Sequence, residues 1–189
     1  MEFIKLEKVK DGKYLKSYEL TYKNKVGKEK KYEIVSRNEL TDIAQVGTIP
    51  SGVSIIATCK SKLLLLHEFR MGVNRTIYNL CAGMLEKDES IEECIQRELQ
   101  EETGLMVKKI HKILPPSFSA VAISDTTTYI AFVEAEGEFF DHTSDNEQIE
   151  AKFYTKEEVA ELIETESFSS RAQLAAFYFC NGGLDHFEP

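Results

Sequence analysis

The sequence predicts an α/β or α+β sandwich, because segments typical of strands precede, separate and follow segments typical of helices. Two apolar runs at residues 53–58 and 63–67 flank the polar turn 59–62, a pattern that indicates a buried hairpin. Apolar residues recur at helical spacing between residues 90 and 104. With 189 residues, the chain should bury roughly 70% of its unfolded surface, which is enough to fold without a disulfide or a metal.

The first fifty residues are predicted to form mostly strands. Residues 14–22 and 31–36 carry aromatic and β-branched side chains, and the polar, glycine-bearing segment 24–30 between them indicates a turn. Further short strands are predicted at residues 77–80, 126–134 and 151–154.

Two helices are predicted near the end of the sequence, at residues 156–164 and 169–179. A serine at the start of the second helix and two glycines after its end supply the expected capping signals. Its apolar residues Leu174, Phe177 and Tyr178 recur at helical spacing, so this stripe is predicted to face the core.

Charge and composition narrow the range of partners. The formal net charge of −9 argues against binding to nucleic acid or to an acidic membrane. A phosphate-bearing substrate is still compatible with this charge, because bound divalent cations reverse the local sign of the charge.

No stretch approaches the ~20 apolar residues of a membrane span, and residues 1–5 do not resemble a signal peptide. The four cysteines form no CxxC pair, so a reducing, cytoplasmic environment is expected.

The segment that carries chemistry runs from Gly83 to Leu105. Ser90 is suited to cap a helix N-terminus, and Glu93 three residues later completes the pattern of a capping box. Gly104 suits the left-handed residue that follows a helix C-terminus. These signals predict a helix over residues 90–104.

Three glutamates of this helix, Glu98, Glu101 and Glu102, are predicted to face one patch of space, since successive residues are about 100° apart. Like charges one turn apart repel each other, and acidic residues near a helix C-terminus oppose the helix dipole. A solvated acidic face is the ordinary explanation of such a run. Bound Mg²⁺ would instead make the cluster favourable, because it takes carboxylate oxygens and leaves positions for substrate phosphates.

The whole segment resembles the Nudix box, GX5EX7REUXEEXGU, where U is an aliphatic residue. Every fixed position is matched, by Gly83, Glu89, Arg97, Glu98, Leu99, Glu101, Glu102, Gly104 and Leu105. The resemblance implies a Nudix hydrolase with an α/β/α sandwich fold. Such an enzyme cleaves a nucleoside diphosphate linked to another moiety and uses Mg²⁺ or Mn²⁺.

The resemblance also implies roles for individual residues. The carboxylates of Glu98, Glu101 and Glu102 would be metal ligands, and the backbone carbonyl of Ala82 is a further candidate ligand. Arg97 would pair with a glutamate of the box and hold it in place. Glu89 would be structural.

Two segments outside the box are similar to the Q-[YF]-R and E-L-P-A-G segments of ADP-ribose pyrophosphatases. They are residues 67–70 and 79–83, in which Glu68 stands for Gln, Asn79 for Glu and Cys81 for Pro. Arg70 is the candidate for gripping a substrate phosphate, although a surface charge is the plain alternative. Cys81 could be a reactive thiol or a small buried packing residue.

The strand-rich N-terminal region resembles the dimerising extension of the same subfamily. Residues 1–48 are therefore expected to form this extension in a homodimer, and residues 49–189 the hydrolase domain. In that subfamily a glutamate on a loop before a late strand often deprotonates the attacking water. Glu147 is the first candidate for this base and Glu150 the second, with a box glutamate such as Glu101 as the alternative.

Together these features predict a cytoplasmic, Mg²⁺- or Mn²⁺-dependent pyrophosphohydrolase of nucleoside diphosphate derivatives. ADP-ribose or a related nucleotide sugar is the first-choice substrate, and the products would be a nucleoside monophosphate and a sugar phosphate. The alternative is a Nudix-like sensor or interaction domain that binds a nucleotide without cleaving it. An intact set of clustered carboxylates argues for the enzyme, because a pure binder has less need of metal ligands.

Overall fold

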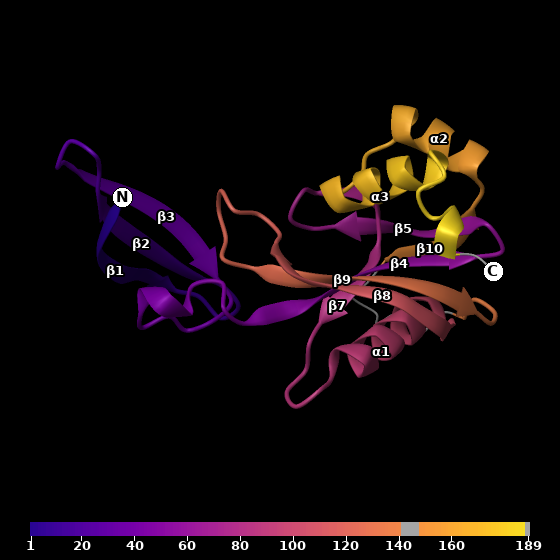
Figure 1. Cartoon of the computed structure of the whole chain (residues 1–189), viewed down its shortest axis with the longest axis horizontal. Coiled ribbons are helices and arrows are strands. Elements are labelled where there is room, and N and C mark those ends of the chain that lie inside the picture. The colour runs from indigo at the N-terminus through magenta and orange to yellow at the C-terminus, as the bar shows by residue number, and fades with distance from the viewer. Residues whose placement is uncertain (141–147, 188–189) are drawn as a thin grey trace. The chain divides into compact units, whose positions relative to one another are not determined.

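The computed structural model describes residues 1–140 and 148–187 (Figure 1). The chain divides into two compact units. They comprise Met1–Ser51 with Pro115–Tyr129, and Gly52–Leu114 with Ile130–Pro189. The assignment of residues 1–48 to a dimerising extension and of residues 49–189 to a hydrolase domain stays a prediction.

In the first unit, three antiparallel strands form a sheet in the order β1-β2-β3. They are β1 (Glu2–Asp11), β2 (Lys16–Lys23) and β3 (Glu29–Ser36). Tyr18, Leu20 and Ile34 from this sheet are buried and pack with Leu40 from the segment that follows it. The hydroxyl of Tyr18 also accepts a hydrogen bond from the backbone N–H of Leu40 at 2.8 Å.

A segment from the middle of the chain completes the first unit by hydrogen bonding to β3. The N–H of Val35 donates to the carbonyl of Ile123 at 2.8 Å. The hydroxyl of Ser36 donates to the buried carboxylate of Asp125 at 3.0 Å. These bonds satisfy polar groups that would be costly to bury without partners.

The second unit contains most of a sheet with the strand order β10-β5-β4-β9-β8, in which β6 pairs with β5 and β7 pairs with β4. The strands are β4 (Pro50–Cys59), β5 (Lys62–Arg70), β6 (Arg75–Asn79), β7 (Cys81–Met84), β8 (Met106–Phe118), β9 (Thr127–Glu136) and β10 (Ile149–Tyr154). β4 is buried over residues 52–58 and β5 over residues 63–66, as the sequence predicts for the hairpin around residues 59–62.

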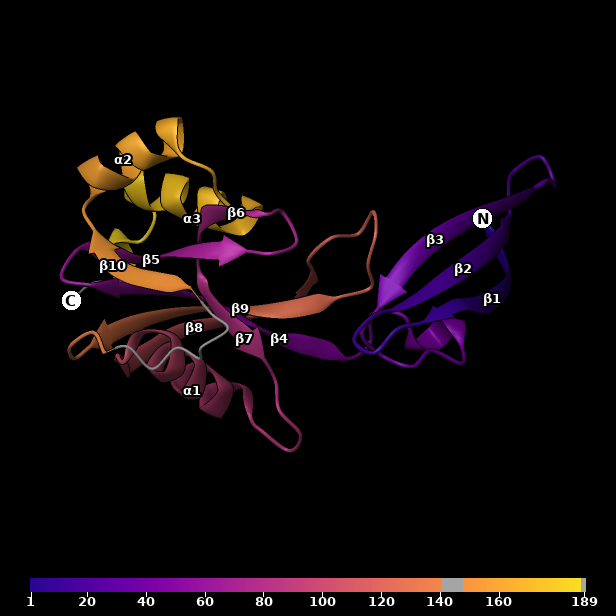
Figure 2. The same cartoon turned by 180° about the vertical axis from the view of Figure 1, so that it is seen from behind.

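Helices cover both faces of this sheet. α1 (Ile91–Thr103) lies on one face, and α2 (Lys156–Thr165) and α3 (Ser170–Cys180) lie on the other (Figures 1 and 2). On the second side, Leu63 and Leu65 of β5 pack with Val159 of α2 and Phe179 of α3. The predicted α/β/α sandwich is confirmed. No helix within the described residues is long and apolar enough to cross a membrane.

The predicted orientation of α3 is wrong. Leu174, Phe177 and Tyr178 are 70%, 61% and 47% exposed, whereas Ala176 and Phe179 are buried. Apolar residues occur on every side of α3, so helical spacing alone does not select the buried face. The structure buries the alanines, whose small side chains allow the helix to approach its neighbours closely.

The long strand β8 has no counterpart among the predicted elements. It contains Pro115 and Pro116, and proline is depleted in strands because it has no N–H to donate to a ladder. β8 is the last strand in the order of the main sheet. An outer position tolerates proline, since one side of the strand needs no donor.

Candidate active site

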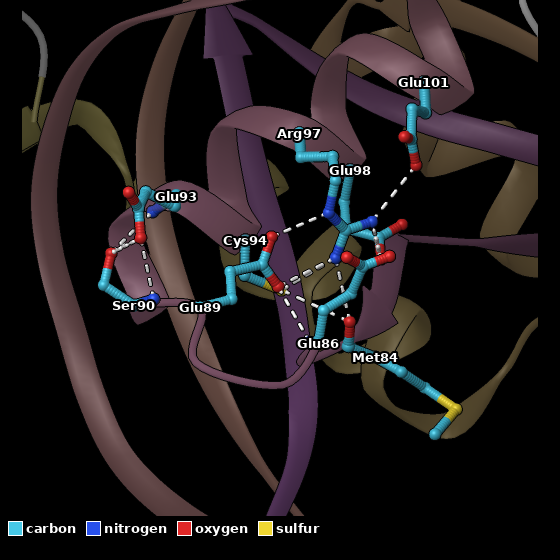
Figure 3. Close-up of polar contacts among 9 residues, drawn as sticks. All are labelled: Met84, Glu86, Glu89, Ser90, Glu93, Cys94, Arg97, Glu98 and Glu101. Carbon is cyan, nitrogen blue, oxygen red and sulfur yellow. Dashed lines mark hydrogen bonds and ion pairs between the residues drawn. The ribbon is translucent and has the colours of Figure 1, made fainter.

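The position of α1 is set by capping groups at both ends. The Ser90 hydroxyl accepts the Glu93 N–H at 3.2 Å, and the Glu93 carboxylate accepts the Ser90 N–H at 2.9 Å (Figure 3). Gly104 ends the helix in the left-handed conformation, with φ of 79°. These contacts satisfy backbone groups that α1 itself leaves unpaired, as the sequence predicts.

The guanidinium of Arg97 joins α1 to the loop that precedes it. It binds the Glu89 carboxylate through two bonds, from Nε to Oε1 at 2.7 Å and from Nη2 to Oε2 at 3.0 Å (Figure 3). The same Nη2 donates to the carbonyl of Met84 at 2.9 Å. Hydrogen bonding to Arg97 is the main reason that the pKa of Glu89 falls to about 2. Glu89 therefore acts as a structural anion that fixes the guanidinium.

Arg97 also contacts two of the three glutamates predicted to bind metal. Its Nη1 lies 2.8 Å from Oε1 of Glu98 and 3.1 Å from Oε2 of Glu101 (Figure 3). The Glu98 side chain is largely buried, whereas that of Glu101 is 59% exposed. One cation thus orders three carboxylates that would otherwise repel one another.

The carboxylate of Glu98 packs directly against the backbone of Gly83 in β7. An ideal Cβ built on Gly83 would lie only 1.7 Å from the carboxyl carbon of Glu98. Any other residue at position 83 would therefore displace this carboxylate. Burial raises the pKa of Glu98 above its ordinary value, against the opposing effect of Arg97.

Glu102 lies against the same strand, one helical turn further along α1. Its Oε2 accepts the backbone N–H of Ala82 at 3.0 Å. Burial raises the pKa of Glu102 to about 8, and the charges of Glu98 and Glu68 push it in the same direction. Glu98, Glu102 and the backbone of β7 therefore form one cluster, in which burial disfavours the charge of both carboxylates even though Arg97 contacts Glu98.

Cys81 belongs to the packing around this cluster. Its side chain is completely buried, and burial together with the nearby Glu102 carboxylate raises its pKa well above the ordinary value. The thiol is therefore neutral, which favours the packing residue over the reactive thiol.

The donor set suits a hard divalent cation. Within the described part of the chain, no three His, Cys, Asp or Glu side chains are gathered closely enough to hold a metal ion as they stand. However, the buried carboxylate of Glu98 and the half-buried carboxylate of Glu102 lie beside the backbone of a strand and match the oxygen ligands that Mg²⁺ prefers. A bound cation would also stabilise the ionised form of Glu102, whose charge is costly in its absence.

Arg70 lies at the end of β5 and lines a cavity of about 260 Å³. The other lining residues are Glu68, Phe69, Met71, Gly72, Gln148 and Ile149. The side chain of Arg70 is 57% exposed and its Nη1 lies 3.2 Å from Oε2 of Glu68. A guanidinium at the edge of a cavity can receive an anionic group.

The two candidate bases outside the box are placed differently. Glu147 lies outside the described residues. Glu150 is exposed on β10, opposite His67 of β5.

The carboxylate of Glu68 is buried beside Arg70 and is not among the site residues predicted from the sequence. It is 5% exposed, and its Oε1 accepts a hydrogen bond from the Asn79 amide at 2.6 Å. Glu68 and Asn79 both differ from the residues at the matching positions of the ADP-ribose pyrophosphatase segments. These two differences together are the signal in the sequence that could have pointed to the pair.

The raised pKa of Glu102 predicts a pH-dependent stability for the metal-free protein. Between pH 4.5 and about 8, folded Glu102 keeps a proton that the unfolded chain has released, so the free energy of unfolding falls as pH rises. Glu102→Gln cannot ionise. With EDTA present, we expect this variant to exceed the wild type in unfolding free energy at pH 8 by on the order of a few kcal/mol.

Urea unfolding at pH 5 and pH 8 measures this effect. The advantage of Glu102→Gln should shrink toward pH 5, where both forms of residue 102 are uncharged. Glu92→Gln, an exposed change on the same helix, is the matched control and should show no such trend. An advantage of equal size at both pH values would contradict the assigned pKa.

Comparisons with known proteins identify the family of this chain. The NUDIX domain model matches residues 48–177. The ADP-ribose pyrophosphatase of Bacillus subtilis (strain 168) is 28% identical over 176 residues, covering 91% of this chain and 88% of that protein. The ADP-sugar pyrophosphatase of Mus musculus is 28% identical over 137 residues, covering 70% of this chain and 60% of that protein.

Two further matches extend the set. The GDP-mannose pyrophosphatase of Yersinia enterocolitica is 31% identical over 119 residues, covering 60% of this chain and 57% of that protein. A crystal structure of an ADP compounds hydrolase superposes on 98% of this chain and 94% of its own with a TM-score of 0.74. Its sequence identity is 17%, so it supports the fold. The NUDIX model covers more than half of the sequence, so this chain belongs to the NUDIX family and is a Nudix hydrolase.

Proposed function

We propose that this Nudix hydrolase is a divalent-cation-dependent pyrophosphohydrolase of nucleoside diphosphate derivatives. ADP-ribose or another nucleotide sugar is the substrate, and the products are a nucleoside monophosphate and a sugar phosphate. Relatives that act on ADP-ribose, ADP-sugars and GDP-mannose support this substrate class. They share a diphosphate that links a nucleoside to a sugar.

The observation that carries the proposal is the placement of Glu98 and Glu102 against β7. Glu98 is buried and Glu102 is half-buried, and burial raises the pKa of both carboxylates above the ordinary value. A protein keeps buried carboxylates in this state at a cost to stability, which a bound cation offsets. A cation here would also reduce the repulsion between the two phosphates of a substrate and a chain with net charge −9.

Glu98, Glu101, Glu102 and the carbonyl of Ala82 would hold Mg²⁺ or Mn²⁺. When bound, the cation supplies electrostatic stabilisation of charge on the phosphoryl oxygens and lowers the pKa of the attacking water. Arg97 keeps Glu98 and Glu101 in place through the bonds described above. Arg70 binds a phosphate oxygen from its position beside the 260 Å³ cavity.

A carboxylate outside α1 deprotonates the water in this proposal. Glu147 is the first candidate and Glu150 the second. Glu101 is the candidate within the box, because its side chain is the most exposed of the three glutamates at the site.

We propose that the enzyme is a cytoplasmic homodimer in which residues 1–48 form the extension between subunits.

The second candidate function, a non-catalytic nucleotide sensor, is disfavoured by Glu98 and Glu102. A binding domain gains nothing from two buried carboxylates that weaken its stability.

Hydrolysis of a nucleotide panel with Mg²⁺ tests the proposed activity. The panel contains ADP-ribose, ADP-glucose, GDP-mannose and ATP, and product analysis identifies the bond that is cleaved. Glu98→Gln and Glu102→Gln should each lower kcat by about 10²-fold or more, because electrostatic stabilisation of the transition state contributes on this scale.

Glu92→Gln is the matched control, since Glu92 lies on the same helix but is exposed and outside the cluster. This variant should keep wild-type turnover. Full activity in Glu98→Gln or Glu102→Gln would remove that residue from the proposed metal site. Binding of these nucleotides without any hydrolysis would favour the sensor.

The identity of the base is tested by comparing Glu147→Gln with Glu101→Gln. Loss of a general base typically lowers the rate by about 10²–10⁴-fold and leaves binding largely unchanged. We therefore expect Glu147→Gln to lower kcat by this amount with little change in KM or in metal affinity. If Glu147→Gln keeps the wild-type kcat while Glu101→Gln abolishes activity, the base lies on α1.

A further inference from the structure

A buried carboxylate that the proposed chemistry leaves unused lies at the end of β5. Glu68 lies on a strand that pairs with β10 on one side and β6 on the other, and it is 5% exposed. Oε1 accepts from the Asn79 amide at 2.6 Å, and Oε2 accepts from Nη1 of Arg70 at 3.2 Å. A buried charge with a partner on each oxygen has a defined orientation.

Asn79 is itself held in one orientation. Its Oδ1 accepts a hydrogen bond from the Ser169 hydroxyl at 2.6 Å. Ser169 is the N-cap of α3, so its own position is fixed by the helix. The amide oxygen of Asn79 is therefore occupied by Ser169, and its NH₂ group points to Glu68.

This chain of contacts ends at a group that faces solvent. Arg70 is 57% exposed in its side chain, and a long exposed side chain samples many rotamers unless it is held. Glu68 contacts one terminal nitrogen of a guanidinium that carries five N–H donors. A single hydrogen bond to Glu68 can orient Arg70, and the remaining N–H donors of the guanidinium can still bind a phosphate.

The same carboxylate connects the cavity to the cluster on α1. Glu68 and Arg70 both line the 260 Å³ cavity, and Glu68 lies near enough to Glu102 for their charges to interact. The cavity and the cluster on α1 therefore share Glu68 as an electrostatic neighbour.

We infer that Glu68 is a positioning residue. Together with Asn79 and Ser169, it fixes the guanidinium of Arg70 at the cavity so that Arg70 binds a phosphate of the nucleoside diphosphate substrate. This inference rests on the proposed function. The hydrogen bonds from Ser169 to Arg70 would therefore contribute to substrate affinity and not to the rate of the chemical step.

The first test is Glu68→Gln. Asn79 and Arg70 both donate to residue 68, and a Gln side chain has one acceptor oxygen for the two of them. Arg70 is the partner nearer to solvent, so it should be released. We expect about a tenfold rise in KM, and a similar rise in the Kd for ADP-ribose with EDTA present, while kcat stays within about threefold.

The decisive variant exchanges the two partners. Asn79→Asp alone sets two carboxylates against each other and should also raise KM and Kd. In the double variant Glu68→Gln/Asn79→Asp, the Gln NH₂ can donate to Asp and the Gln oxygen can accept from Arg70. Ser169 can still donate to position 79. The double variant should therefore recover wild-type KM and Kd to within about threefold.

Arg70→Ala separates positioning from a general structural role. Arg70 is exposed, so its removal should leave the fold intact, and we expect KM and Kd to rise as in Glu68→Gln. Adding Glu68→Gln to Arg70→Ala should produce no further change, because Glu68 acts through Arg70. The inference would be overturned if the double variant Glu68→Gln/Arg70→Ala raised KM and Kd by the product of the two single effects. It would also be overturned if Glu68→Gln/Asn79→Asp failed to recover the wild-type affinity.

The EDTA measurement keeps this inference apart from the proposed function. Metal-free binding requires no turnover, so the comparison of variants holds even if the wild type hydrolyses no member of the panel. Hydrolysis with unchanged affinity in Glu68→Gln would sustain the proposed function and overturn the inference. A wild type that neither binds nor hydrolyses ADP-ribose or another panel member would overturn both.

Discussion

The ionic contact between Arg97 and its acidic neighbours is the interaction on which the rest of the site depends. A single guanidinium binds Glu89 through two bonds, contacts Glu98 and Glu101, and donates to the carbonyl of Met84. Without it, an acidic loop and an acidic helix would have to approach each other against like-charge repulsion. Because Arg97 neutralises part of this charge, α1 can place two carboxylates, Glu98 and Glu102, against the backbone of β7.

Close approach of the helix to that strand is the second constraint. Gly83 leaves room for the Glu98 carboxylate, and the N–H of Ala82 receives Glu102. The resulting site is unfavourable by itself, since burial raises the pKa of both carboxylates. A cation bound there, as we propose, would restore the charge balance and stabilise the folded protein. Arg70, held by Glu68, would then contribute affinity for the substrate from the neighbouring strand.

Much of this arrangement could be predicted from the sequence, because it depends on local signals. Ser90, Glu93 and Gly104 define α1 through capping, and the spacing of the glutamates follows from helical geometry. The buried face of α3 could not be predicted, since apolar residues surround that helix and tertiary packing decides which of them are covered. The hydrogen bond between Glu68 and Asn79 could not be predicted either. It depends on the pairing of β5 with β6 and on Ser169, which is 90 positions from Asn79 in the sequence.

The most direct test of this account is the affinity of the protein for Mg²⁺ after Arg97→Lys, measured by isothermal titration calorimetry. Lysine keeps the positive charge but cannot bind several carboxylates and a carbonyl through a planar fork. We expect affinity for Mg²⁺ to fall by about tenfold or more, as it does when groups that support metal ligands are lost. Arg70→Lys, the matched change outside the cluster, should bind Mg²⁺ as the wild type does. Wild-type affinity in Arg97→Lys would contradict the claim that this guanidinium organises the proposed metal site.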